Sequence, residues 1–307
     1  MIALLTAIGV RARWILALGS VAALFLPSLS AGLRPALPLL VSLVLAMSMA
    51  RIDMLATLRA AVRPVRLLQL LAISILLIPV TACVYGGLGR LVSPEVAASL
   101  VYLGAAPPIA SAAGLCFMLG YNARLALEVT IAATLLTPVL GPLAAAFVLP
   151  ESTLALDPLV LARNLAAMIF GGVVLGVAIR QSVGADRIAR HGAIFDGFAA
   201  CGMLLFVIPM FDRVGALILE DPARALLVLA LAVVFNLGSN LATRRAVAGR
   251  LDAADTGTAG ILMGNRTIGM YLAALPFEPV FALFVALYQF PMFFTPLLMA
   301  RAGRTAA

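Results

Sequence analysis

The sequence predicts an all-α polytopic membrane protein, because long apolar stretches alternate with short connections that carry arginine. Of its 307 residues, 64% are hydrophobic and only 11% are charged, and the mean hydropathy is +1.14. A soluble globular domain has about 25% charged residues, so this composition excludes that class.

Ten stretches have the length and composition of membrane spans, which need about 20 apolar residues each. They are expected to form one transporter domain over residues 1–307. We place the spans at 14–30, 34–50, 67–89, 95–119, 124–148, 159–179, 194–212, 224–243, 257–275 and 280–300.

The basic residues predict the orientation of these spans. All 21 are arginine, which gives a formal net charge of +8 and, with the high alanine content, is typical of a bacterial gene with GC-rich coding. With ten spans, most arginines fall on the side of the two termini, whereas most acids fall on the other side. Cytoplasmic connections carry the positive excess. The protein is therefore expected in the cell inner membrane with both termini in the cytoplasm. On such a chain the arginines indicate topology rather than a nucleic-acid partner.

The two halves of the chain show a short internal similarity. Leu135–Leu140 in the fifth span reads LLTPVL, and Phe293–Leu298 in the tenth reads FFTPLL. Five spans per half would place the second half upside down relative to the first, and inverted repeats are common in transporters. We therefore expect inverted repeats at about 14–149 and 157–302.

Spans 4 and 9 are predicted to be broken and to cross at a binding site. The fourth contains Pro107-Pro108, which removes two backbone donors and disfavours helix before it. The ninth contains Gly264–Gly269, with Arg266 inside the apolar segment. Two interrupted helices at matching places indicate a site near the bilayer midplane, and a buried ionisable residue favours function. Arg266 is the first candidate for binding an anionic substrate; the alternative is a structural bond to carbonyls freed by the break in span 4.

Four further residues are candidate substrate ligands. Asn265 and Thr267 flank Arg266, where they could bond unwound backbone, substrate or both. Ser111 follows the proline pair, where a helix cap is slightly favoured over ligand contact. Thr130 forms a stripe on one face of span 5 with Thr134 and Thr137, which could either line the site or bond their own helix.

Glu128 is an acid inside span 5, so it invites a role in proton coupling or an ion pair with Arg266. Its spacing from Arg124 is four residues, one helical turn. We therefore favour an Arg124–Glu128 pair near the cytoplasmic surface.

Enzymatic chemistry is not expected. The three cysteines, Cys83, Cys116 and Cys201, lie in apolar stretches without metal-ligand spacing, and we find no nucleophile and base pair. The sequence predicts no enzyme, no cofactor and no metal site. Its expected partners are an anionic small molecule and the lipid bilayer, with the oligomeric state left open.

The sequence resembles the bile acid:sodium symporter family, within the bile/arsenite/riboflavin-type transporter superfamily, over nearly the whole chain. The residues that carry the resemblance are Met47–Asp53, Pro107–Pro142, Gly264–Leu275 and Gln289–Pro296. The resemblance implies ten helices arranged as a panel and a core domain, with helices 4 and 9 unwound and crossing.

The sodium ligands that the resemblance implies are mostly missing. Where the family has Ser-Asn after its first crossover, this chain has Ala112 and Ala113. Where helix 5 of the family supplies a serine and a threonine, it has Ala126 and keeps only Thr130. Sodium remains possible, but hard cations prefer several oxygen ligands, including a carboxylate.

The other sodium positions are also changed. Ser74 stands before Pro79 where the family has glutamine, Leu262 replaces the shared glutamate of helix 9, and Arg266 replaces a glutamine. The guanidinium would then take the electrostatic role of the missing cation. The expected function is alternating-access transport of a small organic anion, independent of sodium or differently coupled. The alternatives are a sodium-coupled bile-acid-like symporter, an arsenite-type exporter and a membrane receptor that binds without transporting.

Overall fold

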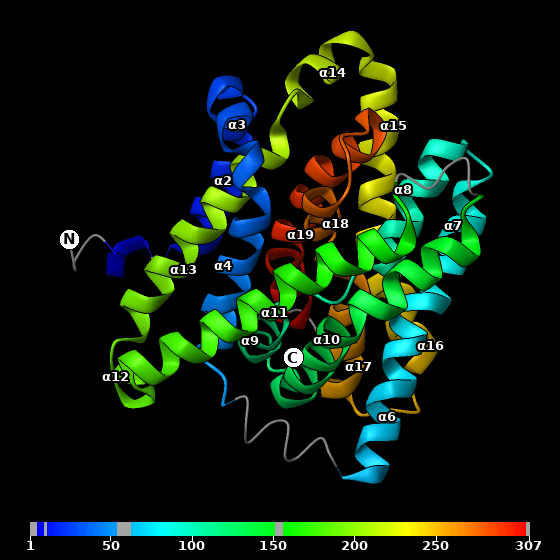
Figure 1. Cartoon of the computed structure of the whole chain (residues 1–307). Coiled ribbons are helices and arrows are strands. Elements are labelled where there is room, and N and C mark those ends of the chain that lie inside the picture. Colours follow the sequence, from blue (N-terminus) through cyan, green and yellow to red (C-terminus); the bar gives the residue numbers. More distant parts are fainter. Residues whose placement is uncertain (1–4, 9–10, 54–62, 151–155, 305–307) are drawn as a thin grey trace. The chain divides into compact units, whose positions relative to one another are not determined.

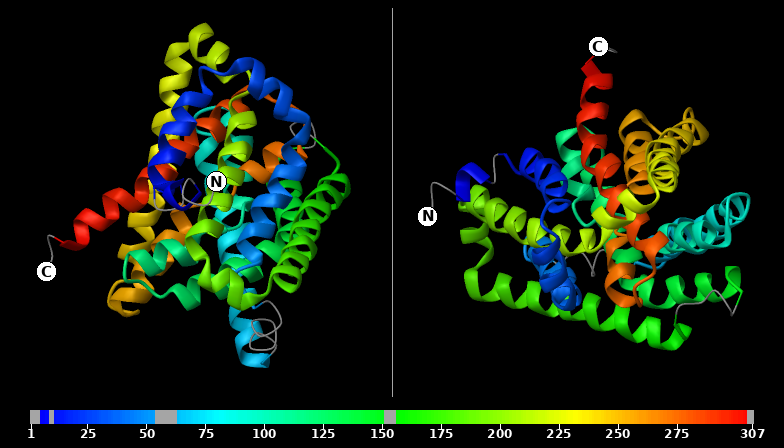
Figure 2. Two further views of the ribbon diagram at one scale, coloured as in Figure 1. Left: turned by 90° about the vertical axis from the view of Figure 1, so that its left-hand side faces the viewer. Right: turned by 90° about the horizontal axis from the view of Figure 1, so that it is seen from above.

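The protein is predominantly helical, and no strand occurs among residues 5–8, 11–53, 63–150 and 156–304, which are those that the computed structural model describes (Figures 1 and 2). Six of the helical segments are long and apolar enough to cross a membrane: Pro27–Met49, Pro64–Gly89, Ala123–Val148, Pro158–Val183, Gly192–Glu220 and Pro222–Val247. They indicate a multi-pass membrane protein, as the sequence predicts.

The chain divides into two compact units, each made from two separate stretches of sequence. The first comprises Met1–Arg59 and Ala166–Pro222. Its helices are α2 (Ala12–Ala23), α3 (Pro27–Leu33), α4 (Leu37–Met49), most of α11 (Pro158–Val183), α12 (Ala185–Arg190), α13 (Gly192–Val207) and α14 (Val214–Glu220).

The second unit comprises Ala60–Leu165 and Ala223–Ala307. Its helices are α6 (Pro64–Ile75), α7 (Thr81–Gly89), α8 (Pro94–Ala105), α9 (Ala112–Met118), α10 (Ala123–Val148), α15 (Pro222–Val233), α16 (Ser239–Val247), α17 (Ala253–Gly264), α18 (Gly269–Ala274) and α19 (Pro279–Arg304). This unit contains all the candidate site residues.

Two helices of the second unit contain a π-turn at the same relative place. Twelve residues of α6 are followed by the π-turn Leu76–Val80 and then by α7; twelve residues of α15 are followed by the π-turn Val234–Gly238 and then by α16. Such turns are rare and often lie at functional sites. Pro79 accounts for the first, since it has no N–H to donate to the α-helical ladder.

Prolines account for one helix boundary that differs from the predicted one, at the end of the first span, whereas two prolines inside α10 do not interrupt that helix. The first span was expected to run to residue 30, but α2 ends at Ala23 and Pro27 begins α3, because proline fits the first turn of a helix. Pro138 and Pro142 lie inside α10 and do not break it. The predicted break of span 4 is confirmed: α8 ends at Ala105, and α9 starts at Ala112.

Candidate functional site

The candidate site is the place in the second unit where the two broken helices meet. Beyond α8 and α17 the chain becomes extended, at Ala106 (φ −74°, ψ 144°) and Asn265 (φ −113°, ψ 105°). The extended segments pair as an isolated antiparallel bridge between Pro108 and Arg266. Ile109 N donates to Asn265 O, and Thr267 N donates to Pro107 O, both at 2.9 Å. Each break therefore satisfies backbone groups of the other, which irregular chain in a membrane requires.

Arg266 lies at this bridge with its side chain fully surrounded by protein. The residue is 1% exposed. Nη1 donates to Leu77 O and to Ala106 O, both at 2.8 Å. Nε donates to Met263 O at 3.0 Å, and Nη2 lies 3.0 Å from Met263 Sδ. The guanidinium thus joins the π-turn after α6, the end of α8 and the end of α17.

These contacts correspond to the structural alternative that the sequence left open for Arg266. Ala106 O is a carbonyl freed where α8 stops, and Leu77 O belongs to the π-turn. Three carbonyl oxygens around one positive charge resemble the surroundings of a bound cation. In this conformation, the guanidinium neutralises freed carbonyls and is not exposed to a ligand.

The two residues beside Arg266 differ in their contacts: Thr267 bonds the unwound backbone, whereas Asn265 keeps one polar atom without a described partner. Thr267 Oγ1 donates to Pro108 O at 3.2 Å, so it bonds unwound backbone. Asn265 is 0% exposed and its Nδ2 donates to Ile261 O at 3.2 Å, whereas its Oδ1 has no hydrogen-bond partner in the described chain. Buried polar atoms are nearly always bonded, so Asn265 Oδ1 has capacity for a water or a ligand donor.

The expected cap at Ser111 is wrong. Its hydroxyl caps no N–H of α9, because its backbone (φ −84°, ψ 5°) is close to helical instead of extended. Ser111 stays partly exposed, three residues beyond the bridge at Pro108.

Thr130 is the fifth candidate and lies on α10. It is 3% exposed, and its Oγ1 has no partner among the described residues. Thr137, in the same stripe, instead donates to Ala133 O of its own helix at 2.7 Å. The two threonines therefore differ: the Thr137 hydroxyl bonds the backbone of its own helix, whereas the Thr130 hydroxyl has no described partner.

A polar network on the other side of the break was not identified as part of the site from the sequence. Gly264 O accepts from Asn236 Nδ2 at 2.6 Å and from Tyr288 Oη at 2.5 Å. Thr295 Oγ1 donates to Asn236 Oδ1 at 2.6 Å. Asn236 lies in the second π-turn, and its polarity in an apolar span was the one available signal. These bonds hold the end of α17, so the backbone before Arg266 is fixed from two sides.

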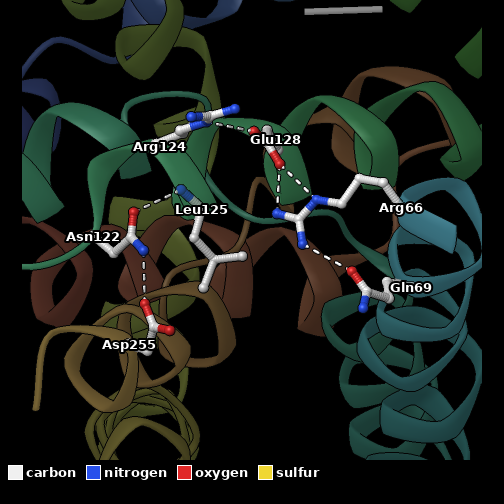
Figure 3. Close-up of polar contacts among 7 residues, drawn as sticks. All are labelled: Arg66, Gln69, Asn122, Arg124, Leu125, Glu128 and Asp255. Carbon is white, nitrogen blue, oxygen red and sulfur yellow. Dashed lines mark hydrogen bonds and ion pairs between the residues drawn. The ribbon is translucent and has the colours of Figure 1, made fainter. Parts of the chain in front are cut away.

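Glu128 makes no described contact with Arg266. It lies in a separate ion cluster with Arg66 and Arg124 (Figure 3). The predicted pair is confirmed: Arg124 Nε lies 3.0 Å from Glu128 Oε1. A second partner comes from α6, since Arg66 Nε and Nη2 contact Glu128 Oε2 at 2.8 and 2.5 Å. The sequence did not show this partner, because Arg66 is distant in the chain and reaches Glu128 only through the packing of α6 on α10.

The two arginines of this cluster should differ in their effect on stability. The Arg66 side chain is 33% exposed, against 83% for Arg124. Exposed pairs contribute about 0–1 kcal/mol, whereas hydrogen bonds to charged groups in shielded surroundings contribute about 1.5–3 kcal/mol. We expect Arg66→Gln to lower the free energy of unfolding by at least 1 kcal/mol more than Arg124→Gln, in denaturant titrations of the purified protein in detergent micelles. Equal effects would mean that α6 is not anchored through Glu128.

Compared with known proteins, the chain matches no family model and no curated protein sequence. Among the described residues, no three His, Cys, Asp or Glu side chains gather as a metal site. The crossing contains one buried positive charge, freed carbonyls that accept hydrogen bonds from it, and polar atoms on Asn265 and Thr130 that have no partner among the described residues.

Proposed function

We propose that this protein is a secondary transporter of a small organic anion that works by alternating access. The observation that carries the proposal is the burial of Arg266 where two broken helices pair. Discontinuous helices at membrane depth mark the binding sites of many transporters. A buried positive charge favours an anion as the substrate, since the local potential is positive even where no donor of the guanidinium is free.

The proposed architecture is ten membrane helices in two inverted five-helix repeats. A constant separation of 158 residues supports it. This separation relates Pro64 to Pro222, the first residues of α6 and α15, which each lead into a π-turn. It also relates Pro108 to Arg266, the two residues of the bridge. It also relates Thr137 to Thr295, each of which donates to the carbonyl four residues earlier at 2.7 Å. A pseudo-two-fold axis through the bridge explains why the two hydrogen bonds there are reciprocal.

We further propose membership of the bile acid:sodium symporter family as a divergent member, in the cell inner membrane with both termini cytoplasmic. The division of the chain supports this, because the broken helices, α10 and α19 share one compact unit, as expected for a core domain. Ser74, at the position of a family sodium ligand, donates to Leu70 O of its own helix at 2.8 Å. Together with the guanidinium on the freed carbonyls, this favours transport without sodium.

Sodium independence is tested by the melting temperature of the purified protein in sodium or choline chloride at equal ionic strength. A cation that binds the native state stabilises it by mass action. We expect no sodium-specific rise in the wild type. Arg266→Gln should melt lower and regain part of the loss in sodium, because its freed carbonyls become available to the ion. A sodium-specific rise in the wild type would instead favour a sodium-coupled symporter.

Transport itself is tested in proteoliposomes by counterflow of labelled carboxylates, with a short-chain and a sterol carboxylate as the first probes. Stabilisation by a carboxylate together with counterflow supports the transporter. Stabilisation without counterflow would favour the receptor alternative. An arsenite-type exporter needs an accessible thiolate near the crossing, whereas Cys116 on α9 is 0% exposed; arsenite-dependent stabilisation lost in Cys116→Ser would favour that alternative.

A further inference from the structure

The first unit contains an apolar cleft that has no role in the proposed transport site. Its volume is about 650 Å³, within the range of small-molecule sites. It is lined by α4, by the chain around α12 and by α13. Ten of its twelve lining residues are apolar, among them Leu43, Phe198 and Leu205, and the other two are Arg187 and His191.

The charged end of the cleft belongs at the membrane surface. Arg187 lies on the six-residue helix α12, which also carries Asp186 and Arg190 and directly follows α11, one of the long apolar helices. Three charges in six residues are incompatible with the hydrocarbon core. On the predicted topology, this end faces the cytoplasm.

The apolar part of the cleft has the depth of one leaflet. Its lining along α13 runs from Ile194 to Leu205, which corresponds to about 16 Å at 1.5 Å per residue. Half of the hydrocarbon thickness of a bilayer is about 15 Å. A chain that enters beside α12 therefore has an apolar path as long as the acyl region of one leaflet.

Arg187 is available to an anion at the mouth of this path. Its guanidinium makes no hydrogen bond or ion pair within the described parts of the chain, and its carbonyl accepts from His191. Asp196, the acid on α13, is already paired with Arg51, whose Nη2 lies 2.5 Å from Asp196 Oδ1. Asp186 is on the same short helix, and the backbone carbonyl of that residue accepts from Arg190.

We propose that this cleft binds an anionic phospholipid of the bilayer, with an acyl chain along α13 and the phosphate at Arg187. The apolar lining, its one-leaflet depth and the Arg187 guanidinium at its surface end, which has no partner in the described chain, together fit such a lipid. A carboxylate or phosphate without an acyl chain would use only the mouth of the cleft. A zwitterionic lipid would carry a positive group beside the same arginine.

Two variants test the two parts of the proposed lipid site separately, the phosphate contact and the acyl path. Arg187→Gln removes the charge, and Arg190→Gln is its matched control, because it removes the same charge from the same helix but lies outside the cleft lining. Gly202→Leu fills the apolar path. Among the described residues, a Cβ at position 202 would have one neighbour within 4 Å, Leu43 Cδ2 at 3.9 Å, so there is room for a larger side chain that extends into the cleft.

The experiment is native mass spectrometry of delipidated protein titrated with phosphatidylglycerol, phosphatidylcholine of the same chains, or glycerol phosphate. We expect phosphatidylglycerol to bind the wild type and the Arg190→Gln variant alike, about fivefold more weakly to Arg187→Gln, and not measurably to Gly202→Leu. The melting temperature of each lipid-free variant checks that it is folded. Equal affinity for phosphatidylcholine, equal loss in Arg190→Gln, unchanged binding to Gly202→Leu or binding of glycerol phosphate would each overturn the proposal.

Discussion

Arg266→Ala is expected to lower the free energy of unfolding by about 3–5 kcal/mol, because it leaves three buried carbonyl acceptors without a donor. The substitution leaves the carbonyls of Leu77, Ala106 and Met263 without the guanidinium that bonds them. Each unsatisfied buried acceptor costs about 1–3 kcal/mol, and a water that enters the vacated volume would recover part of this.

The measurement is unfolding of the purified protein in mixed micelles, followed by circular dichroism. Arg250→Ala is the control, because Arg250 is exposed and its side chain makes no described contact; its effect should be within about 0.5 kcal/mol. Arg266→Lys should fall between the two, since an ammonium keeps the charge but not the planar set of donors. A loss below about 1 kcal/mol in Arg266→Ala would show that the three carbonyls find other donors in solution.

The contacts of Arg266 reconcile the two roles that the sequence allowed. On the proposed transport function, a guanidinium whose donors are directed at protein carbonyls and a thioether does not need to touch the substrate to favour an anion, because its charge raises the local electrostatic potential. On that proposal, other groups would make the direct contacts with the substrate. Asn265 and Thr130 have unused polar atoms, and Ser111 has a partly exposed hydroxyl.

Local sequence signals predicted the features that depend on chemistry within one helix. Pro107-Pro108 removes backbone donors, so the end of α8 could be placed within a few residues. The spacing of Arg124 and Glu128 fixes their side chains on one face, so their pair could be predicted as well. In both cases the partners are close in the chain and helix geometry alone brings them together.

Features that depend on packing between distant segments could not be predicted. Arg266 bonds Leu77, which is 189 residues away, and only the folded unit brings these residues together. The π-turn at Val234–Gly238 contains no proline that would interrupt the α-helical hydrogen bonds, so the change of helix type there could not be predicted. The cap expected at Ser111 failed for the same kind of reason: pairing of Pro107–Ile109 with the other broken helix sets the backbone that precedes it.

Gly104→Ala is the second substitution for which we expect a large effect. A Cβ at Gly104 would lie 2.6 Å from both Cα and N of Ala82 and 2.8 Å from the carbonyl carbon of Thr81, all backbone atoms. Since backbone cannot rotate aside, α8 would have to move away from α7. Such overpacking costs about 1–3 kcal/mol, which exceeds the gain of up to about 1 kcal/mol from replacing glycine in a helix. Gly87→Ala on α7 is the matched control: nothing lies within 4 Å of its Cβ, so it should be neutral or stabilising.

The same movement should reach Arg266, because Nη1 bonds Leu77 O next to α7 and Ala106 O at the end of α8. Separating these helices stretches at least one of the two bonds, so part of the cost of Gly104→Ala is loss of the Arg266 contacts. In the double variant Gly104→Ala/Arg266→Ala, the Arg266 contacts are already absent. Its loss of unfolding free energy should therefore be about 0.5–3 kcal/mol smaller than the sum of the losses in the two single variants. Additivity within about 0.3 kcal/mol, measured by the same unfolding titration, would mean that the spacing of α7 and α8 and the position of the guanidinium are independent.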